Sequence, residues 1–160
     1  MKLIYPTKEQ IIEAHNKVIE ISGGLEGIKY IGHIESPLYH IEIDDYYPNF
    51  EDKLTHLVFS INKNHAFEDG NKRTSIAVGV LFLELNGFEV DTVRKFIREM
   101  GDIAVCVADN HIDKDFLKEI IFSIIFEDDY DEELKIRIIW ALEKMKVTHN
   151  EHTETNDELY

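Results

Sequence analysis

The chain has 160 residues, of which 44% are hydrophobic and 31% are charged, and these values are typical of one globular domain with its own core. Its formal net charge of -15 excludes broad binding to nucleic acid and to anionic membranes, because both ligands repel an acidic surface. The single cysteine excludes an internal disulfide, and neither a membrane-length apolar run nor a secretory pattern is present, so we expect a soluble, cytoplasmic protein.

The first part of the chain shows two stretches in which apolar residues have helical spacing. Thr7 and Gln10 form a capping-box pattern at the start of the first stretch, and SGG at 22–24 ends it. Residues 25–48 are irregular, and within them the alternating run LYHIEI predicts a short strand or hairpin arm. Asn49 is the expected cap of a second helix, whose apolar residues recur at i, i+3, i+4 and i+7.

Helical spacing continues through the middle of the chain. A very apolar helix is expected to start at Asn71 or Lys72 and to end at NG, with Gly87 as its left-handed terminator. Two further helices are expected over 92–108 and 114–126, capped by Asp91 and Asp113.

The last fifth of the chain is an acidic extension. Residues 127–160 hold eleven acidic and four basic residues, so they supply close to half of the net charge. The amphipathic stretch 131–146 predicts a helix that adds a layer to the core, fills a groove in cis or pairs two subunits through Trp140. We therefore expect a mainly α fold with a domain at 1–126, a helical extension at 127–147 and a disordered tail at 148–160.

The segment NHAFEDGNKRTSIAVGVLFLELNG, residues 64–87, places polar side chains directly before the most apolar helix. Gly70 and a polar turn at a helix N-terminus expose backbone N–H groups, which attract an anion together with the helix dipole. Asn71 adds amide donors, while Lys72 and Arg73 add positive charge in forms that suit phosphate oxygens. These residues form a candidate phosphate site.

Two further side chains of this segment supply chemistry. Asp69 is a hard oxygen ligand that can hold Mg²⁺ against phosphates. His65 can take a proton from an attacking hydroxyl, and Phe67 is expected to anchor the loop between them in the core. An anion site, a metal ligand, cationic groups and a base together are the parts required for phosphoryl transfer.

Each of these residues also has a purely structural interpretation. His65 alone can cap the preceding helix, and Asp69 alone is more readily an N-cap than a metal ligand. Lys72 and Arg73 oppose the dipole of a first helical turn, so their position requires an anion or a nearby carboxylate. The whole combination matches by chance on the order of 10⁻¹⁰ times per window, which favours the functional interpretation.

The segment HAFEDGNKRT resembles the signature of the Fic/Doc (Fido) superfamily, and within it the Doc, or death-on-curing, form H-x-F-x-D-(A/G)-N-K-R-T. HNKVIEISGGLEGI at 15–28 resembles the Gly-Gly-Leu segment after the first Doc helix, and LFLELNG at 81–87 resembles the end of the motif helix. The similarity covers roughly residues 4–126.

This resemblance implies a Fido-type helical bundle with a small β-hairpin flap at 38–47 that aligns the target chain. His65 matches the catalytic base of the family, and Asp69 matches its Mg²⁺ ligand. The residues that match the nucleotide- and phosphate-binding turn are Gly70, Asn71, Lys72 and Arg73.

Two positions distinguish the branches of the superfamily. Fic adenylyltransferases have glycine at the position of Lys72 and a second arginine at the position of Ile76. The resemblance to the Doc form therefore implies a kinase that uses Mg·ATP to phosphorylate a target hydroxyl, with elongation factor Tu as the family's known target class. An adenylyltransferase, to which Gly70 points, and an inactive Fido module that only binds a partner are the alternatives.

The Doc resemblance also implies a partner. In the Doc system, an antitoxin inserts a helix near the active site and blocks it. SGGLEG, residues 22–27, formally matches the inhibitory-helix pattern of Fic proteins, but its two glycines disfavour a helix there, so we do not assign an inhibitory role to Glu26.

Overall fold

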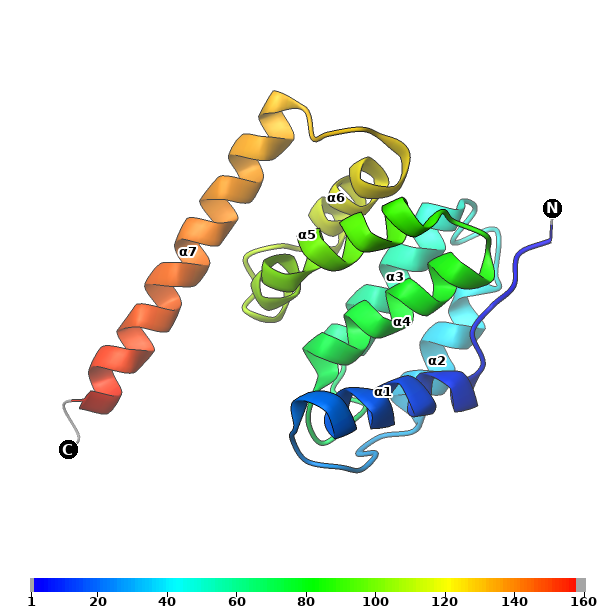
Figure 1. Cartoon of the computed structure of the whole chain (residues 1–160), viewed down its shortest axis with the longest axis horizontal. Coiled ribbons are helices and arrows are strands. Elements are labelled where there is room, and N and C mark those ends of the chain that lie inside the picture. The colour runs from blue at the N-terminus through cyan, green and yellow to red at the C-terminus, as the bar shows by residue number, and fades with distance from the viewer. Residues whose placement is uncertain (1, 158–160) are drawn as a thin grey trace.

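The computed structural model describes residues 2–157, with side chains to residue 152, and this part of the chain forms seven helices joined by loops (Figure 1). The helices are α1 (Lys8–Ser22), α2 (Gly32–Ile41), α3 (Phe50–Lys63), α4 (Asn71–Leu85), α5 (Val90–Ala108), α6 (Lys114–Phe126) and α7 (Glu132–Asp157). The prediction of a mainly α fold is confirmed.

Helix α4 lies at the centre of the bundle and packs against α1, α3 and α5. Its buried face includes Val78, Phe82 and Leu83, all of which are fully inaccessible to solvent. Between them Gly79 lets the neighbouring helices approach closely, since a Cβ atom there would lie 2.6 Å from Cζ of Phe96. The site at the N-terminal end of α4 is therefore fixed by the core of the molecule.

Several helix ends follow the capping residues that the sequence predicts. The Thr7 hydroxyl accepts from the Gln10 N–H at 3.1 Å, and the Gln10 side chain accepts from the Thr7 N–H at 2.9 Å. Gly87 is left-handed, with φ 77°, and Asp113 accepts from the N–H of Phe116 at 2.8 Å. The prediction that Asp91 caps α5 is wrong, because the helix starts at Val90 with Glu89 as its N-cap.

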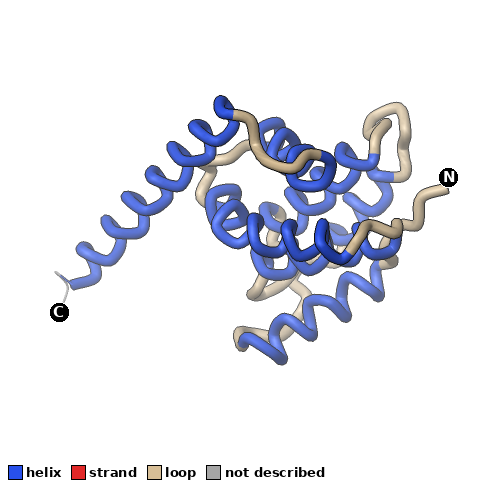
Figure 2. The backbone as a smooth tube through the Cα atoms, turned by 45° about the horizontal axis from the view of Figure 1, so that its top comes forward, coloured by secondary structure: helices blue, strands red, loops and turns tan. Residues whose placement is uncertain are grey.

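The predicted hairpin flap at 38–47 is absent from the described part of the chain, which contains no strand (Figure 2). Helix α2 takes up the first part of that range. Its buried residues Ile34, Pro37 and Ile41 recur at helical spacing and α2 packs against α3, so tertiary packing outweighs the local alternation of LYHIEI. Pro37, a residue type that disfavours a helix interior, lies inside α2.

Helix α7 contacts α5 and then projects from the bundle (Figures 1 and 2). Leu134, Ile138 and Ala141 form its buried stripe, while Trp140 is 66% exposed. The predicted helix at 131–146 is thus present as a further layer, but it continues to Asp157 through most of the range expected to be disordered, since extending an existing helix is cheaper than nucleating one. Residues 158–160 of that range lie outside the described residues.

Membrane crossing requires a helix that is both long and apolar. None of the helices within residues 2–157 combines the two properties.

Candidate functional site

Phe67 anchors the loop that joins α3 to α4, as the sequence predicts. Its side chain is 1% exposed, and its ring stacks on the ring of His15 in α1 with a centroid distance of 3.9 Å. An isolated antiparallel bridge joins Phe67 to Ile28 in the segment that follows α1. Helix α1 and the segment that follows it thus hold the middle of the loop that joins α3 to α4.

Asn71, in the first turn of α4, also holds Phe67, through hydrogen bonds to its backbone. Its Oδ1 accepts from the Phe67 N–H at 3.1 Å, and its Nδ2 donates to the Phe67 carbonyl at 3.0 Å. The side chain is almost buried, with 9% exposure. In this structure the Asn71 amide therefore fixes the loop, whereas the sequence had suggested that it offers donors to a phosphate.

His65 begins the motif at the end of α3. Its backbone is left-handed, with φ 50°, a conformation that is uncommon for non-glycine residues and that concentrates at functional sites. The side chain is exposed, and its ring has no hydrogen-bond partner among the described residues. Asn64 is the C-cap of α3, and the left-handed backbone of His65 directly after it ends the helix as Gly87 ends α4, so the structural interpretation holds for the backbone of His65 and leaves its imidazole free to act.

Asp69 is held at three points. Its carbonyl accepts from Nε2 of His15 at 2.8 Å, its Oδ1 accepts from the Gly70 N–H at 2.8 Å, and its Oδ2 accepts from the Leu25 N–H at 3.0 Å. The hydrogen bonds from Leu25 and Gly70 lower the pKa of the carboxyl below its usual range. The N-cap of α4 is Gly70, so Asp69 does not act as the N-cap.

Gly70 starts α4 in the left-handed conformation, with φ 74°. A Cβ atom at this position would lie 3.1 Å from Cδ1 of Ile19 and 3.3 Å from Nη2 of Arg73, so a larger residue would displace its neighbours. The Thr74 N–H is the first in α4 to find a backbone acceptor, the Gly70 carbonyl. The amides that precede it in the first turn remain available to an anion.

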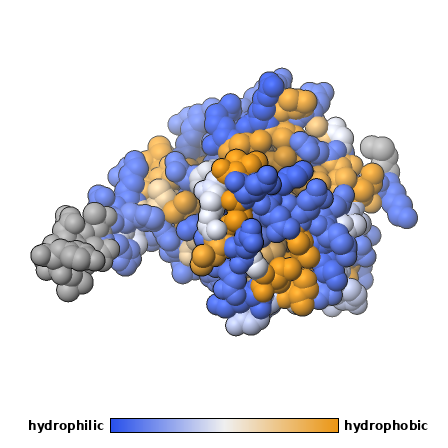
Figure 3. Space-filling view, turned by 60° about the horizontal axis from the view of Figure 1, so that its bottom comes forward, coloured by the Kyte–Doolittle hydropathy of each residue, from blue (hydrophilic) through white to orange (hydrophobic). Residues whose placement is uncertain are grey.

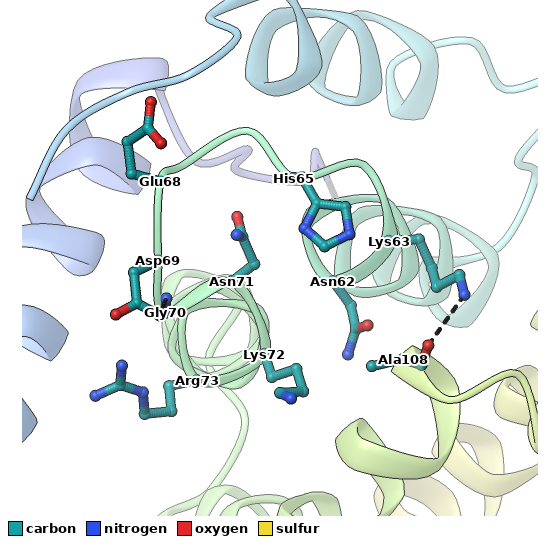
Figure 4. Close-up of a pocket in the computed structure, with 10 residues that line it drawn as sticks. All are labelled: Asn62, Lys63, His65, Glu68, Asp69, Gly70, Asn71, Lys72, Arg73 and Ala108. Carbon is teal, nitrogen blue, oxygen red and sulfur yellow. Dashed lines mark hydrogen bonds between the residues drawn. The ribbon is translucent and has the colours of Figure 1, made fainter. Parts of the chain in front are cut away.

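The two cationic residues of the motif lie on opposite sides of this helix end. Figure 4 shows Arg73 beside Asp69 and Lys72 on the side of Lys63 and Ala108. Nη1 of Arg73 donates to the Gly23 carbonyl at 2.8 Å, whereas the ammonium of Lys72 has no hydrogen-bond or ion-pair partner among the described residues. Lys72 is therefore the less constrained of the two charges.

All of the predicted site residues line one cavity of about 380 Å³ (Figure 4). The residues that line it are Asn62, Lys63, His65, Glu68, Asp69, Gly70, Asn71, Lys72, Arg73 and Ala108. Three of these side chains are cationic and two are carboxylates, so the cavity is locally positive in a chain whose net charge is -15. Such a cavity suits an anionic ligand.

Sequence reasoning missed several residues that build this site. Lys63 lies in the wall of the cavity, where its ammonium donates to the carbonyl of Ala108 at 3.4 Å. Asn62 is 3% exposed, and its Oδ1 has no hydrogen-bond partner within the part of the chain that the structure describes. The sequence marks His15 as unusual, because it is a polar residue on the apolar face of α1 between Ile11 and Ile19. Its partner could not be predicted, because the hydrogen bond to Asp69 joins residues 54 positions apart in the sequence.

Comparison with known proteins adds independent information. The model of the Fic/DOC family matches residues 5–83. The chain is 40% identical over 63 residues to a protein named Toxin Doc from Mycolicibacterium smegmatis, a match that covers 36% of this chain and 48% of that protein. It is 35% identical over 89 residues to Protein kinase doc of Escherichia phage P1, which covers 51% of this chain and 68% of the phage protein.

Proposed function

The chain belongs to the Fic/DOC family, and on that premise we propose that it is a Doc-like toxin that transfers the γ-phosphate of ATP to a hydroxyl of a target protein. One observation carries the proposal: His65, Asp69 and the start of α4 line a single, locally positive cavity. The protein is then a protein-modifying transferase within a toxin–antitoxin system.

The start of α4 supplies the groups that bind the phosphates of ATP. Backbone N–H groups that follow Gly70 donate to phosphate oxygens, and the helix dipole adds to their attraction. Arg73 and Lys72 bring positive charge from opposite sides of the helix end, as Figure 4 shows for their side chains. The Asn71 amide contributes indirectly, because it holds the loop.

Asp69 is the residue that holds Mg²⁺ in this proposal. Mg²⁺ is commonly bound by one or two carboxylates, with substrate phosphates and waters as the other ligands, so a single carboxylate is sufficient. The site fits that pattern: Asp69 keeps its carboxylate ionised through two backbone hydrogen bonds, and the described residues contain no cluster that could hold a metal by protein ligands alone. When bound, Mg²⁺ neutralises charge on the phosphate oxygens.

His65 acts as the base. Its imidazole accepts the proton of the target hydroxyl while the hydroxyl oxygen forms a bond to the γ-phosphorus. The bond between the γ-phosphorus and the oxygen that bridges it to the β-phosphate breaks, and ADP leaves with that oxygen. The imidazole later returns its proton to solvent, so the residue is regenerated.

Lys72 and Ile76 favour phosphate transfer over AMP transfer. Lys72 lines the cavity at the position where Fic adenylyltransferases have glycine, and Ile76 packs against the core, where it offers no charge to a nucleotide. The phage P1 relative carries the name of a protein kinase, which agrees with this choice. AMP transfer is the second candidate, and Gly70 favours it.

Labelled ATP separates the two reactions. The purified chain is incubated with Mg²⁺, elongation factor Tu as the candidate target, and ATP labelled at either the γ- or the α-phosphate. We expect label on the target from the γ position only and none with His65→Ala. Label from the α position would replace the kinase assignment with AMP transfer. If His65→Ala inhibits growth as strongly as the wild type does, the protein is a binding module and not an enzyme.

The antitoxin of such a system needs a docking site near the active site, and we place it in the groove between α1 and α4. This groove has a volume of about 570 Å³ and begins at Arg73, which also lines the candidate active site. Ile21, on its rim, is 84% exposed, and Figure 3 shows apolar patches among polar surface on the face of the molecule that carries α1. The groove suits one amphipathic helix.

Co-expression tests this partner. A short reading frame upstream of the gene is expected to encode the antitoxin and to restore growth when it is expressed with the toxin. Ile21→Lys should keep the toxicity but lose the rescue, because it places a charge in the apolar groove. Full rescue of Ile21→Lys would place the antitoxin elsewhere.

A further inference from the structure

The turn Ser22–Leu25 ends α1 and lies against the start of α4. Helix α1 closes with the Gly23 N–H donating to the Ile19 carbonyl at 2.9 Å, and both glycines of the turn have positive φ, 82° for Gly23 and 123° for Gly24. All four residues of the turn are exposed. The turn is therefore held by its polar contacts and not by burial.

The turn provides a hydrogen bond to the carboxylate that we assign to Mg²⁺. Oδ2 of Asp69 accepts from the Leu25 N–H at 3.0 Å, while Oδ1 accepts from the Gly70 N–H at 2.8 Å. One oxygen is thus oriented from within the motif, and the other by a residue 44 positions earlier in the chain. Both rotatable bonds of the Asp69 side chain are fixed by this pair of contacts.

The same turn holds the guanidinium of Arg73. Nη1 of Arg73 donates to Oγ of Ser22 at 2.6 Å and to the Gly23 carbonyl at 2.8 Å. The Ser22 hydroxyl donates in turn to the Val18 carbonyl at 2.7 Å, which fixes its orientation as an acceptor for Arg73. Three of the four residues of the turn, Ser22, Gly23 and Leu25, thus bind two side chains of the site.

Gly24 makes this double contact sterically possible. A Cβ atom at Gly24 would lie 2.6 Å from Oδ2 of Asp69 and 3.1 Å from Nη2 of Arg73. At Gly23, by contrast, a Cβ atom would have no heavy atom within 4 Å, although its φ is also positive. Gly24 is therefore the position in the turn where a side chain would collide with Asp69 and Arg73, whereas Gly23 contributes its carbonyl to Arg73.

We propose that the turn Ser22–Leu25 is a positioning element that holds Asp69 and Arg73 in the arrangement needed to bind the phosphates of a nucleotide, and that Gly24 is its critical residue. The inference rests on the proposed function, since it assigns the turn to the same site. It adds a segment outside the motif to the residues that determine nucleotide affinity.

The test compares Gly24→Ala with Gly87→Ala in the full chain. Both substitutions force alanine into a positive φ, but Gly87 follows the other end of α4 and a Cβ atom there would meet no heavy atom within 4 Å, so only the first pushes a methyl group against Asp69 and Arg73. We measure the ¹H–¹⁵N signals of the Leu25 amide and the Arg73 guanidinium, the dissociation constant for Mg·AMP-PNP by calorimetry, and the urea midpoint. Ser22→Ala, on the exposed surface, removes one acceptor of Arg73 and serves as a milder variant.

For Gly24→Ala we expect the Leu25 and Arg73 signals to shift and exchange faster, and the affinity for Mg·AMP-PNP to fall at least tenfold. Gly87→Ala should leave affinity within about twofold of the wild type at a urea midpoint similar to that of Gly24→Ala, and Ser22→Ala should lower the affinity two- to fivefold. Equal spectra and equal affinities for the two glycine variants would overturn the inference. If the wild type binds no nucleotide, the proposed function fails, and the spectra alone decide whether the turn positions the two side chains.

Discussion

Replacing Gly79 by alanine tests how α4 is fixed in the core. The added Cβ atom would lie 2.6 and 2.7 Å from two ring carbons of Phe96 and 3.1 Å from Cγ2 of Val58, well inside ordinary van der Waals contact. Phe96 is fully buried, so the ring cannot turn toward solvent. Overpacking of this kind costs about 1–3 kcal/mol, whereas alanine gains about 1 kcal/mol over glycine in helix propensity. We expect a net loss of stability of up to about 2 kcal/mol.

Urea unfolding followed by far-ultraviolet circular dichroism measures this loss. Gly101→Ala is the matched control, because Gly101 also lies in a helix but its Cβ atom would meet nothing within 4 Å. We expect Gly101→Ala to stabilise the chain by about 0.5–1 kcal/mol, so the two variants should move in opposite directions. If Gly79→Ala stabilises the chain as Gly101→Ala does, the close packing of α4 against Phe96 is refuted.

Two further predictions concern titratable groups in the core. Burial raises the pKa of the Cys106 thiol to about 11. At pH 8, iodoacetamide should therefore label the native chain at least tenfold more slowly than the urea-unfolded chain, and mass spectrometry measures both rates. Equal labelling rates would contradict the burial of the thiol. Burial, and then the Lys114 ammonium, lower the pKa of His56 to about 4. The unfolded chain takes up this proton below about pH 6.5 and the folded chain does not, so His56 should cost about 2 kcal/mol of stability between pH 7 and pH 5. His56→Gln should lack that part of the pH dependence in urea unfolding; an unchanged dependence would contradict the assignment.

The sequence was most informative where a local chemical rule sets the structure. Thr7, Asn49, Asp113 and Gly87 mark helix ends because a cap acts within a few residues of itself. Helix α2 was missed because its evidence is tertiary: Ile34, Pro37 and Ile41 form a helical face only once α3 is there to cover it. The alternating run LYHIEI, directly after Pro37, gave a misleading local signal for a strand.

In the candidate site, too, the local features could be predicted from the sequence and the tertiary contacts could not. The motif residues were predicted together because they are adjacent in sequence, and the fold places them around one cavity. Their supporting contacts come from far along the chain: Leu25 and His15 both bind Asp69, and Ala108 accepts from Lys63. No local pattern specifies such pairs, since each depends on how α1, α3 and α5 pack around α4.

The hydrogen bonds between Asn71 and Phe67 change how a loss of activity at Asn71 is to be interpreted. An alanine at this position is ordinarily taken to report a lost ligand contact. Here it would release both backbone groups of Phe67, the midpoint of the span that separates the proposed base from the proposed metal ligand. The distance between His65 and Asp69 would then fluctuate. Proton transfer at His65 and metal binding at Asp69 would both weaken, although Asn71 itself takes part in neither.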